Sequence, residues 1–274
     1  MTFYERLMNL DRRWVYLVVG IAVIIPVLNP FRVPIYVTSE VKAIYDYVES
    51  LKPGEILFLG IDYDPNAMAE LHPMAKAIMR QCFSKDIKLV ICALSQNGPG
   101  MAEQLISEHA KEFEKKSGID YCYLGYKPYP GITILAMGQN FRIPFPTDYY
   151  GVALDSLPMM RDVRNYDNVK AVIDICAGSI ADMWIVNANG RYNAKVALGV
   201  TGVMAANYYP YLQSGQIFGL MGGLKGASEY ETLSKMGDRA IKMMSIQTTA
   251  HIVVILFIVM GNIGYFMSKK KKKQ

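Results

Sequence analysis

The side chains best suited to chemistry lie close together in one short segment. Five polar residues fall within eleven positions, and they are Asp62, Asp64, Asn66, Glu70 and His72. Carboxylate oxygens and an imidazole can bind a divalent metal, so the candidate metal ligands are Asp62, Asp64 and His72. The favoured alternative is an Asp-Pro-Asn turn that caps a helix and leaves the histidine at the surface. A divalent metal is thus a hypothesis that the segment permits without favouring it.

This polar segment follows the apolar run Glu55–Ile61, which indicates a buried parallel strand. Proline is disfavoured inside helices, so Pro73 leads us to expect a loop over residues 62–72. In open α/β sheets, ligands bind outside the carboxyl ends of the strands. Polar groups at the ends of the other expected strands therefore complete the candidate ligand-binding set: Ser95, Asn97, Lys127 and Asp174.

An apolar strand followed by Asp-x-Asp resembles the opening motif of the haloacid-dehalogenase-type phosphotransferases. The resemblance covers only Ile56–Asp64. Pro65 and Asn66 replace the small and hydroxyl residues that follow in that family, and no later acidic pair completes the pattern. Ser95, after the second expected strand, could imitate the second motif. The resemblance would imply phosphoryl transfer at the end of the first strand.

Apolar runs alternate with helical patterns through the middle of the chain. Helices are expected over 38–51, 74–83 and 97–116, with turn or capping residues near their ends. This alternation predicts an α/β fold with a doubly wound, mostly parallel, Rossmann-like sheet of about five strands and right-handed crossovers. The expected strands are Glu55–Ile61, Ile87–Ala93, Ile119–Leu124, Val169–Ile175 and Lys195–Val200.

No complete catalytic motif accompanies this architecture. The glycine cluster 215–226 contains a lysine but lacks the order of a phosphate-binding P-loop, so close helix packing is its favoured interpretation. Ser179 lacks the Gly-x-Ser-x-Gly context of a nucleophilic serine. With only three histidines in the chain, no Ser/His/Asp set can be assembled. The glycines assigned to helix packing are Gly219, Gly222, Gly223 and Gly226.

Two apolar segments predict membrane anchors at the two ends. Residues 14–28 form an uncharged run, and with the following interfacial residues we expect a transmembrane signal anchor over 14–31. A cleaved signal peptide is the competing interpretation, but no small-residue cleavage site follows the run. Residues 250–267 are apolar and are closed by a lysine run, which predicts a second transmembrane helix.

A methionine-rich stripe precedes the second anchor at helical spacing. It predicts one long helix in which residues 228–249 form a juxtamembrane part that continues into the membrane. An apolar stripe must be covered, and we expect a homo-oligomer formed through residues 228–267. The stripe consists of Leu233, Met236, Ala240, Met243 or Met244, and Gln247.

Charge is concentrated in the tails. The formal net charge is +5, but residues from Val33 to the second span hold 20 basic and 22 acidic side chains, so a nucleic-acid partner is not expected. The positive-inside rule places the tails 1–13 and 268–274 in the cytoplasm and the domain 32–227 outside. Four cysteines without metal-like spacing are expected to be small buried apolar residues: Cys82, Cys92, Cys122 and Cys176.

The sequence therefore favours a membrane-anchored α/β binding or assembly (scaffold) module that is non-enzymatic and homo-oligomeric. We expect the protein to lie in the cell membrane, which it would cross with two spans. Other membrane or extracytoplasmic proteins are possible partners. The alternative is a membrane-tethered hydrolase or transferase whose site lies at the carboxyl edge of the sheet, with or without a metal.

Overall fold

The computed structural model describes residues 11–236 and 239–271. The chain divides into two compact units, an α/β domain over 35–240 and a second unit made of 1–34 and 241–274.

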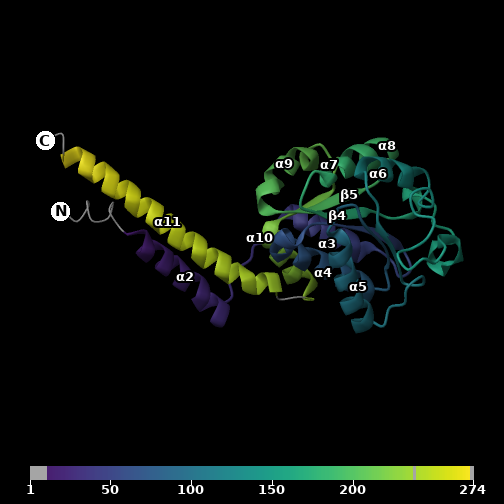
Figure 1. The fold of residues 1–274 in the computed structure, drawn as a ribbon, viewed down its shortest axis with the longest axis horizontal. Helices are drawn as coiled ribbons and strands as arrows, with labels where there is room; N and C mark the ends of the chain where they lie inside the picture. The colour runs from purple at the N-terminus through teal and green to yellow at the C-terminus, as the bar shows by residue number, and fades with distance from the viewer. Residues whose placement is uncertain (1–10, 237–238, 272–274) are drawn as a thin grey trace. The chain divides into compact units, whose positions relative to one another are not determined.

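The α/β domain is built on one six-stranded sheet in which every neighbouring pair is parallel. The strand order is β3-β2-β1-β4-β5-β6, and Figure 1 shows helices on both faces of this sheet. The five expected strands are confirmed, and a sixth was not expected. The strands are β1 Ile56–Asp62, β2 Lys88–Ala93, β3 Tyr121–Tyr126, β4 Val172–Cys176, β5 Val196–Val200 and β6 Gly219–Gly222.

The strands are mostly apolar and buried because helices cover both faces of the sheet. The strongest helix contact is between α4 and α10, which lie on one face with α3 and α5, whereas α6, α7 and α9 lie on the other. A π-helix over Trp184–Asn189 joins α7 to α8. The helices of the domain are α3 Ser39–Ser50, α4 Met68–Ser84, α5 Gly98–Glu112, α6 Pro130–Gln139, α7 Ile180–Met183, α8 Gly190–Tyr192, α9 Gly202–Gln213 and α10 Gly223–Ser234.

The unexpected strand β6 lies inside the glycine cluster. A Cβ on Gly219 would lie 2.3 Å from Ile44 Cγ1, so this strand is glycine-rich because α3 packs directly on it. Gly222 also lies close to α9, where its Cβ would meet that of Ala205 at 2.8 Å. The glycines do permit close packing with helices, as expected, but two of them lie in a strand and only Gly223 and Gly226 lie in a helix.

The prediction of a loop over residues 62–72 is wrong in its second half. After a single 3-10 turn over Pro65–Ala67, α4 begins at Met68, and Pro73 lies inside it. Pro73 is fully within the buried face of the helix. The proline removes one backbone donor from α4, and packing of the surrounding apolar side chains outweighs this local cost.

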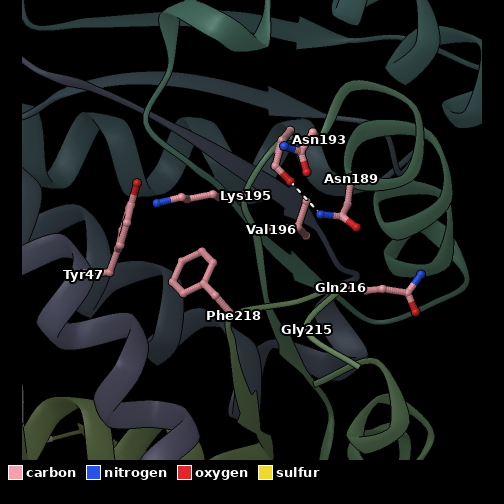
Figure 2. Close-up of a pocket in the computed structure, with 9 residues that line it drawn as sticks. Tyr47, Asn189, Asn193, Lys195, Val196, Gly215, Gln216 and Phe218 are labelled. Carbon is pink, nitrogen blue, oxygen red and sulfur yellow. Dashed lines mark hydrogen bonds between the residues drawn. The ribbon is translucent and has the colours of Figure 1, made fainter. Parts of the chain in front are cut away.

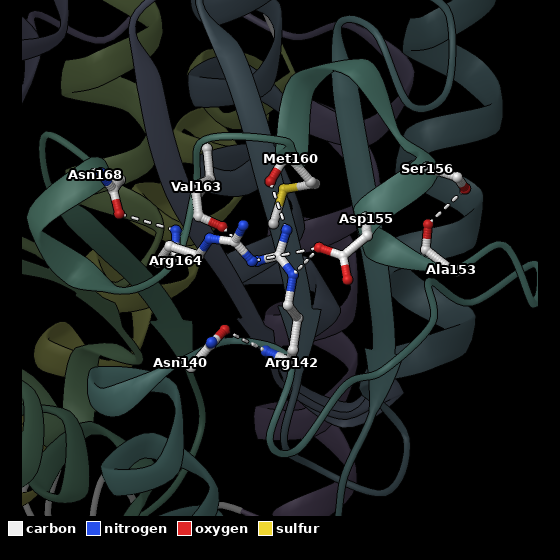
Figure 3. Close-up of polar contacts among 9 residues, drawn as sticks. All are labelled: Asn140, Arg142, Ala153, Asp155, Ser156, Met160, Val163, Arg164 and Asn168. Atoms are coloured by element: carbon white, nitrogen blue, oxygen red, sulfur yellow. Dashed lines mark hydrogen bonds and ion pairs between the residues drawn. The ribbon is translucent and has the colours of Figure 1, made fainter.

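A long irregular excursion over 140–170 connects α6 to β4 and contains three short 3-10 turns, Leu154–Ser156, Pro158–Met160 and Tyr166–Asn168. Arg142 holds it together, as Figure 3 shows. Its guanidinium donates to Val163 O at 2.7 Å, to Met160 O at 2.8 Å and to Asp155 Oδ1 at 2.6 Å. The three nitrogens of one guanidinium thus satisfy a carboxylate and two backbone carbonyls that an irregular loop leaves without helix or sheet partners.

The expected single helix from Ser228 into the membrane is also wrong. Helix α10 ends at Ser234, where Lys235 takes a left-handed conformation with φ 55° and donates its N–H to Glu231 O. A new helix, α11, runs from Arg239 to Lys271. A residue with positive φ closes a helix because the chain direction changes there.

Among the described residues, one helix is long and apolar enough to cross a membrane, namely residues 239–267 of α11. Large apolar side chains project outward along it. The first predicted span is not supported, because α2 (Arg12–Leu28) has 17 residues and begins with two arginines, whereas a span needs about 20. Helices α2 and α11 belong to the same compact unit.

Candidate functional site

The strand order changes direction between β1 and β4, since β2 and β3 lie on one side of β1 and β5 and β6 lie beyond β4. Ligands of doubly wound sheets bind at the carboxyl end of such a switch point. Two of the sequence-predicted residues meet there, because Asp62 ends β1 and Asp174 lies in β4 opposite Gly60. Residues two apart in a strand share a face, so both carboxyl groups lie on the same side of the sheet.

Asp62 is tied to the loop after β2. Its side chain is 2% exposed, and Oδ1 accepts the N–H groups of Leu94 at 2.5 Å and Ser95 at 3.0 Å. The same loop continues into α5, where a Cβ on Gly98 would lie 2.3 Å from Ile61 O. The carboxylate therefore fixes the start of α5 against the end of β1, which is a structural task that two backbone donors perform well.

Asp174 is fully buried and occupies space that Gly60 leaves open, since a Cβ on Gly60 would lie 2.3 Å from Asp174 Oδ1. Among the described residues, no donor at hydrogen-bonding geometry reaches Asp62 Oδ2 or either oxygen of Asp174. Two ionised carboxylates cannot donate to each other, so one proton between them supplies the missing bond.

The electrostatics identify which carboxyl group carries that proton. Burial and the neighbouring charge of Asp62 raise the pKa of Asp174 well above its usual value. Burial also raises the pKa of Asp62, but the N–H groups of Leu94 and Ser95 oppose this by stabilising its charged form. Because two backbone N–H groups stabilise the charged form of Asp62, we expect the shared proton to reside on Asp174 and Asp62 to accept from it.

Trp184, the first residue of the π-helix, is buried beside the Asp62–Asp174 pair. The indole is fully buried and packs 5.2 Å from the Phe58 ring. Its N–H has no acceptor at hydrogen-bonding geometry in the described part of the chain, although it lies near enough to Asp62 to favour that carboxylate's charged form. The pair is thus enclosed by apolar groups and one weakly placed donor.

A second polar contact lies at the surface above this pair. Asn97 Nδ2 donates to Asp64 Oδ1 at 2.9 Å, and Ser95 Oγ accepts the N–H of Gly98 at 3.1 Å. The loops after β1 and β2 therefore bring Asp64, Ser95 and Asn97 together at the carboxyl edge, as their positions in the sequence indicate. Asp64 and Ser95 are partly exposed, and Asn97 is exposed.

The other predicted residues do not join this group. Glu70 Oε2 accepts the N–H of Gly202 at 2.8 Å, at the start of α9. His72 is buried and its Nδ1 lies 3.0 Å from Tyr63 Oη, so it is not a surface histidine. Lys127 Nζ lies 5.8 Å from the centre of the Phe145 ring. Asn66 is exposed in the 3-10 turn.

The three candidate metal ligands do not meet as one set. Asp62, Asp64 and His72 have separate partners, and the described residues hold no group of three or more His, Cys, Asp or Glu side chains suited to a metal. The four cysteines are free and buried, as expected. Burial raises the pKa of the Cys82 thiol, and likewise that of the other three, which favours the thiol over the nucleophilic thiolate at neutral pH.

Sequence reasoning missed two residues that define the buried pair, Gly60 and Trp184. Gly60 carried a readable signal, because an isolated glycine inside an apolar strand marks a close approach by another group. Trp184 carried none, because a tryptophan in a helical segment is most often a packing residue.

The fold and the site define a class: a doubly wound α/β domain with a carboxyl pair buried at its switch point. Comparison of the chain with protein-family models, with curated proteins and with solved structures gives no match, so the dehalogenase-type resemblance has no support there. The function is therefore inferred from the fold and from the geometry of the site.

Proposed function

We propose that this chain is a membrane-anchored α/β binding or assembly module without catalytic activity. The observation that carries the proposal is the burial of the carboxyl pair, since Asp62 is 2% exposed and Asp174 is 0% exposed. A group that acts on a substrate must touch it, and these two do not reach the surface. The groups that do reach the carboxyl edge, Asp64 and Asn97, bond to each other and form a polar contact surface.

The competing function is a hydrolase or transferase, favoured by one specific observation. Two neighbouring carboxyl groups whose pKa values differ are a common acid and base arrangement. A panel of ester, phosphate and glycoside substrates, assayed with the full-length chain in detergent, separates the two functions. Turnover that Asp174→Asn abolishes while the fold is retained would refute the binding proposal. Binding to a partner that survives Asp174→Asn but is weakened by Asp64→Ala supports it.

Membrane attachment rests on α11. Its outward-facing isoleucine, valine and leucine side chains are 43–57% exposed between Ile252 and Ile263, and lipid is the environment in which such a surface is stable. Removal of residues 250–274 should release the protein from membranes washed with carbonate. Retention of the shortened chain in the membrane would show that α2 or the domain also binds lipid.

The oligomer proposal rests on the methionine stripe. Met236, Met243 and Met244 remain half-exposed, although the stripe is divided between the end of the domain and the start of α11. Converting Met243 and Met244 together to glutamine should dissociate a complex held by this stripe, whereas Lys242→Gln alters an exposed position on the same helix. Native mass spectrometry in detergent reads the subunit number. A monomeric wild-type chain would refute the proposal.

The proposed topology has both tails in the cytoplasm and the domain outside, which requires residues 14–31 to cross the membrane with α11, although α2 by itself is too short to be a span. The support is the uncharged run 14–28, whose large side chains are mostly exposed, and the lysine tail. A cysteine at Ser107, an exposed position of α5, should react with an impermeant maleimide in intact cells. The four native cysteines are buried and leave the background low. If only a cysteine placed at Gln274 reacts, the orientation is the inverse of the proposed one and the proposal is wrong.

A further inference from the structure

The cavity at the amino ends of β5 and β6 does not gather its polar groups around one point. Its volume is about 300 Å³, and Figure 2 shows the Lys195 ammonium turned toward Tyr47 and the Gln216 amide turned away from it. No single small ligand could meet both groups. The surface that most needs a partner lies instead on helix α11, in the part that is apolar enough to cross a membrane.

Helix α11 has two different faces over residues 251–263. Only Val253 and Phe257 are half-buried in this stretch, and every other residue is exposed. Val253 and Phe257 are four residues apart, so they share one face of the helix. The far side of the helix carries the polar side chains of His251 and Asn262. These two are eleven residues apart, which places them within about 20° of each other around the helix axis.

The exposed polar face follows a heptad pattern, the α11 seam, which is formed by His251, Ile255, Ile258 and Asn262. These residues follow one another at intervals of four, three and four, the spacing of the a and d positions of a coiled coil. Ile255 and Ile258 are each 57% exposed. Met244 of the methionine stripe precedes His251 by seven residues. The stripe that supports the proposed oligomer therefore continues directly into this seam.

Asn262 is the residue that makes the seam costly in lipid. It lies about 5 Å along the helix from the middle of the apolar run 250–267, well inside a hydrocarbon layer about 30 Å thick. Its Nδ2 donates to Ile258 O at 2.9 Å, which uses one of its two N–H groups. In the described part of the chain this side chain makes no other hydrogen bond. Lipid tails offer no donor or acceptor, so the remaining N–H and Oδ1 require a second polar group.

A second copy of the chain supplies that group, whereas the first apolar segment of the same chain does not. The run 14–28 carries no polar side chain beyond Trp14 and Tyr16 near its start. Two copies with the same topology place their α11 helices parallel, and identical heptad positions then face each other across a two-fold axis. An asparagine amide has both a donor and an acceptor, so the Asn262 side chains of two copies can complete each other.

We propose that α11 pairs in parallel with α11 of a second copy through the α11 seam, with the two Asn262 side chains hydrogen-bonded to each other inside the membrane. Ile255 and Ile258 pack against their counterparts on the domain side of this contact. A buried asparagine at an a position holds paired helices in one register, so the amide contact also fixes their alignment. The inference rests on the proposed membrane anchoring and homo-oligomer, and it assigns the face and the polar contact through which the copies meet.

The first test locates the face by disulfide crosslinking of the full-length chain in phosphatidylcholine vesicles, with copper phenanthroline as the oxidant. Ile255→Cys and Ile258→Cys should each give an intermolecular disulfide, because seam positions of parallel copies face each other. Val253→Cys and Phe257→Cys lie on the half-buried face and are the matched controls, which should stay uncrosslinked. The four native cysteines are buried and leave the background low. Equal crosslinking on both faces would mean random collision and would overturn the proposal.

The second test measures association by energy transfer between chains labelled at Ser107→Cys, over a series of protein-to-lipid ratios. Asn262→Leu should weaken association about tenfold, the range of an interhelical hydrogen bond in lipid. Asn262→Gln keeps a donor and an acceptor and should retain most of it. Leu256→Ala, an exposed position off the seam, is the control and should change little.

The outcomes separate this inference from the proposed function. A wild-type chain that associates equally well after Asn262→Leu would refute the amide contact and leave the homo-oligomer standing. A wild-type chain that stays monomeric in vesicles would refute the homo-oligomer as well, and Asn262 would then meet a helix of another membrane protein.

Discussion

The buried carboxyl pair makes the sharpest prediction, through Asp174→Asn. Asparagine has the shape of aspartic acid, and its NH₂ group can donate to Asp62 as the protonated carboxyl does. The substitution therefore removes the titrating group at residue 174 and keeps its contact with Asp62. We expect the variant to be more stable than the wild-type chain at neutral and alkaline pH and equally stable near pH 4.

The magnitude follows from proton linkage. Burial and Asp62 raise the pKa of Asp174 in the folded state above its unfolded value, so the folded chain binds the proton more tightly. Stability from this group is complete below the unfolded pKa of about 3.9 and is lost as pH rises toward the folded pKa. The loss is about 1.4 kcal/mol for each pH unit in that window. Asp174→Asn removes this loss, so its advantage over the wild-type chain should grow with pH until the folded pKa is reached.

The assay is thermal unfolding in detergent from pH 4 to pH 9, read by the fluorescence of Trp184 beside the pair. One kcal/mol corresponds to a shift in Tm of about 2–4 °C for a domain of this size. Asp167→Asn, at an exposed position, is the control and should follow the wild-type curve. If Asp174→Asn is less stable than the wild-type chain at pH 8, or if its advantage does not change with pH, the pair does not hold a proton and the reasoning fails.

Three further predictions use other parts of the domain, each measured as the free energy of unfolding. Gly60→Ala should cost about 1–3 kcal/mol, because its Cβ would lie 2.3 Å from Asp174 Oδ1, and an unchanged stability would mean that Asp174 moves freely. Arg142→Lys should cost about 1–3 kcal/mol by losing part of its three-way contact, while the exposed Arg164→Lys should change little; equal effects would contradict the contact's role. Burial lowers the pKa of His72 to about 4 from 6.5, so stability should fall by about 3 kcal/mol as pH drops through that window. His72→Gln should flatten that fall, and an unchanged slope would assign it to other groups.

Most of the sheet could be predicted from the sequence. The five apolar runs became β1 to β5 because a parallel strand covered on both faces needs apolar residues at every position, and that pattern is local. Strand β6 was not predictable in the same way. Its glycines are explained only by packing: Gly219 meets Ile44 of the distant helix α3, and Gly222 meets Ala205 of the preceding helix α9.

Helix boundaries likewise depend on both local sequence preference and tertiary packing. The positive φ of Lys235 separates α10 from α11, whereas periodicity alone predicts one helix across this point. Pro73 suggested a loop, but α4 continues past this proline because its neighbouring residues are buried. In both places the local preference is about 1–3 kcal/mol, which tertiary packing can outweigh.

The candidate site was determined in part by the sequence. Chain order placed Asp64, Ser95 and Asn97 after neighbouring strands, so their convergence follows from parallel pairing. What only the tertiary structure decided was the depth of Asp62 and Asp174. A carboxyl group at a strand end is exposed or buried according to the loop and helix that cover it. The groups that cover Asp62, Leu94 and Trp184, come from elements distant from it in sequence. Residue types fix what a side chain can do chemically, whereas long-range packing fixes whether water and ligands can reach it.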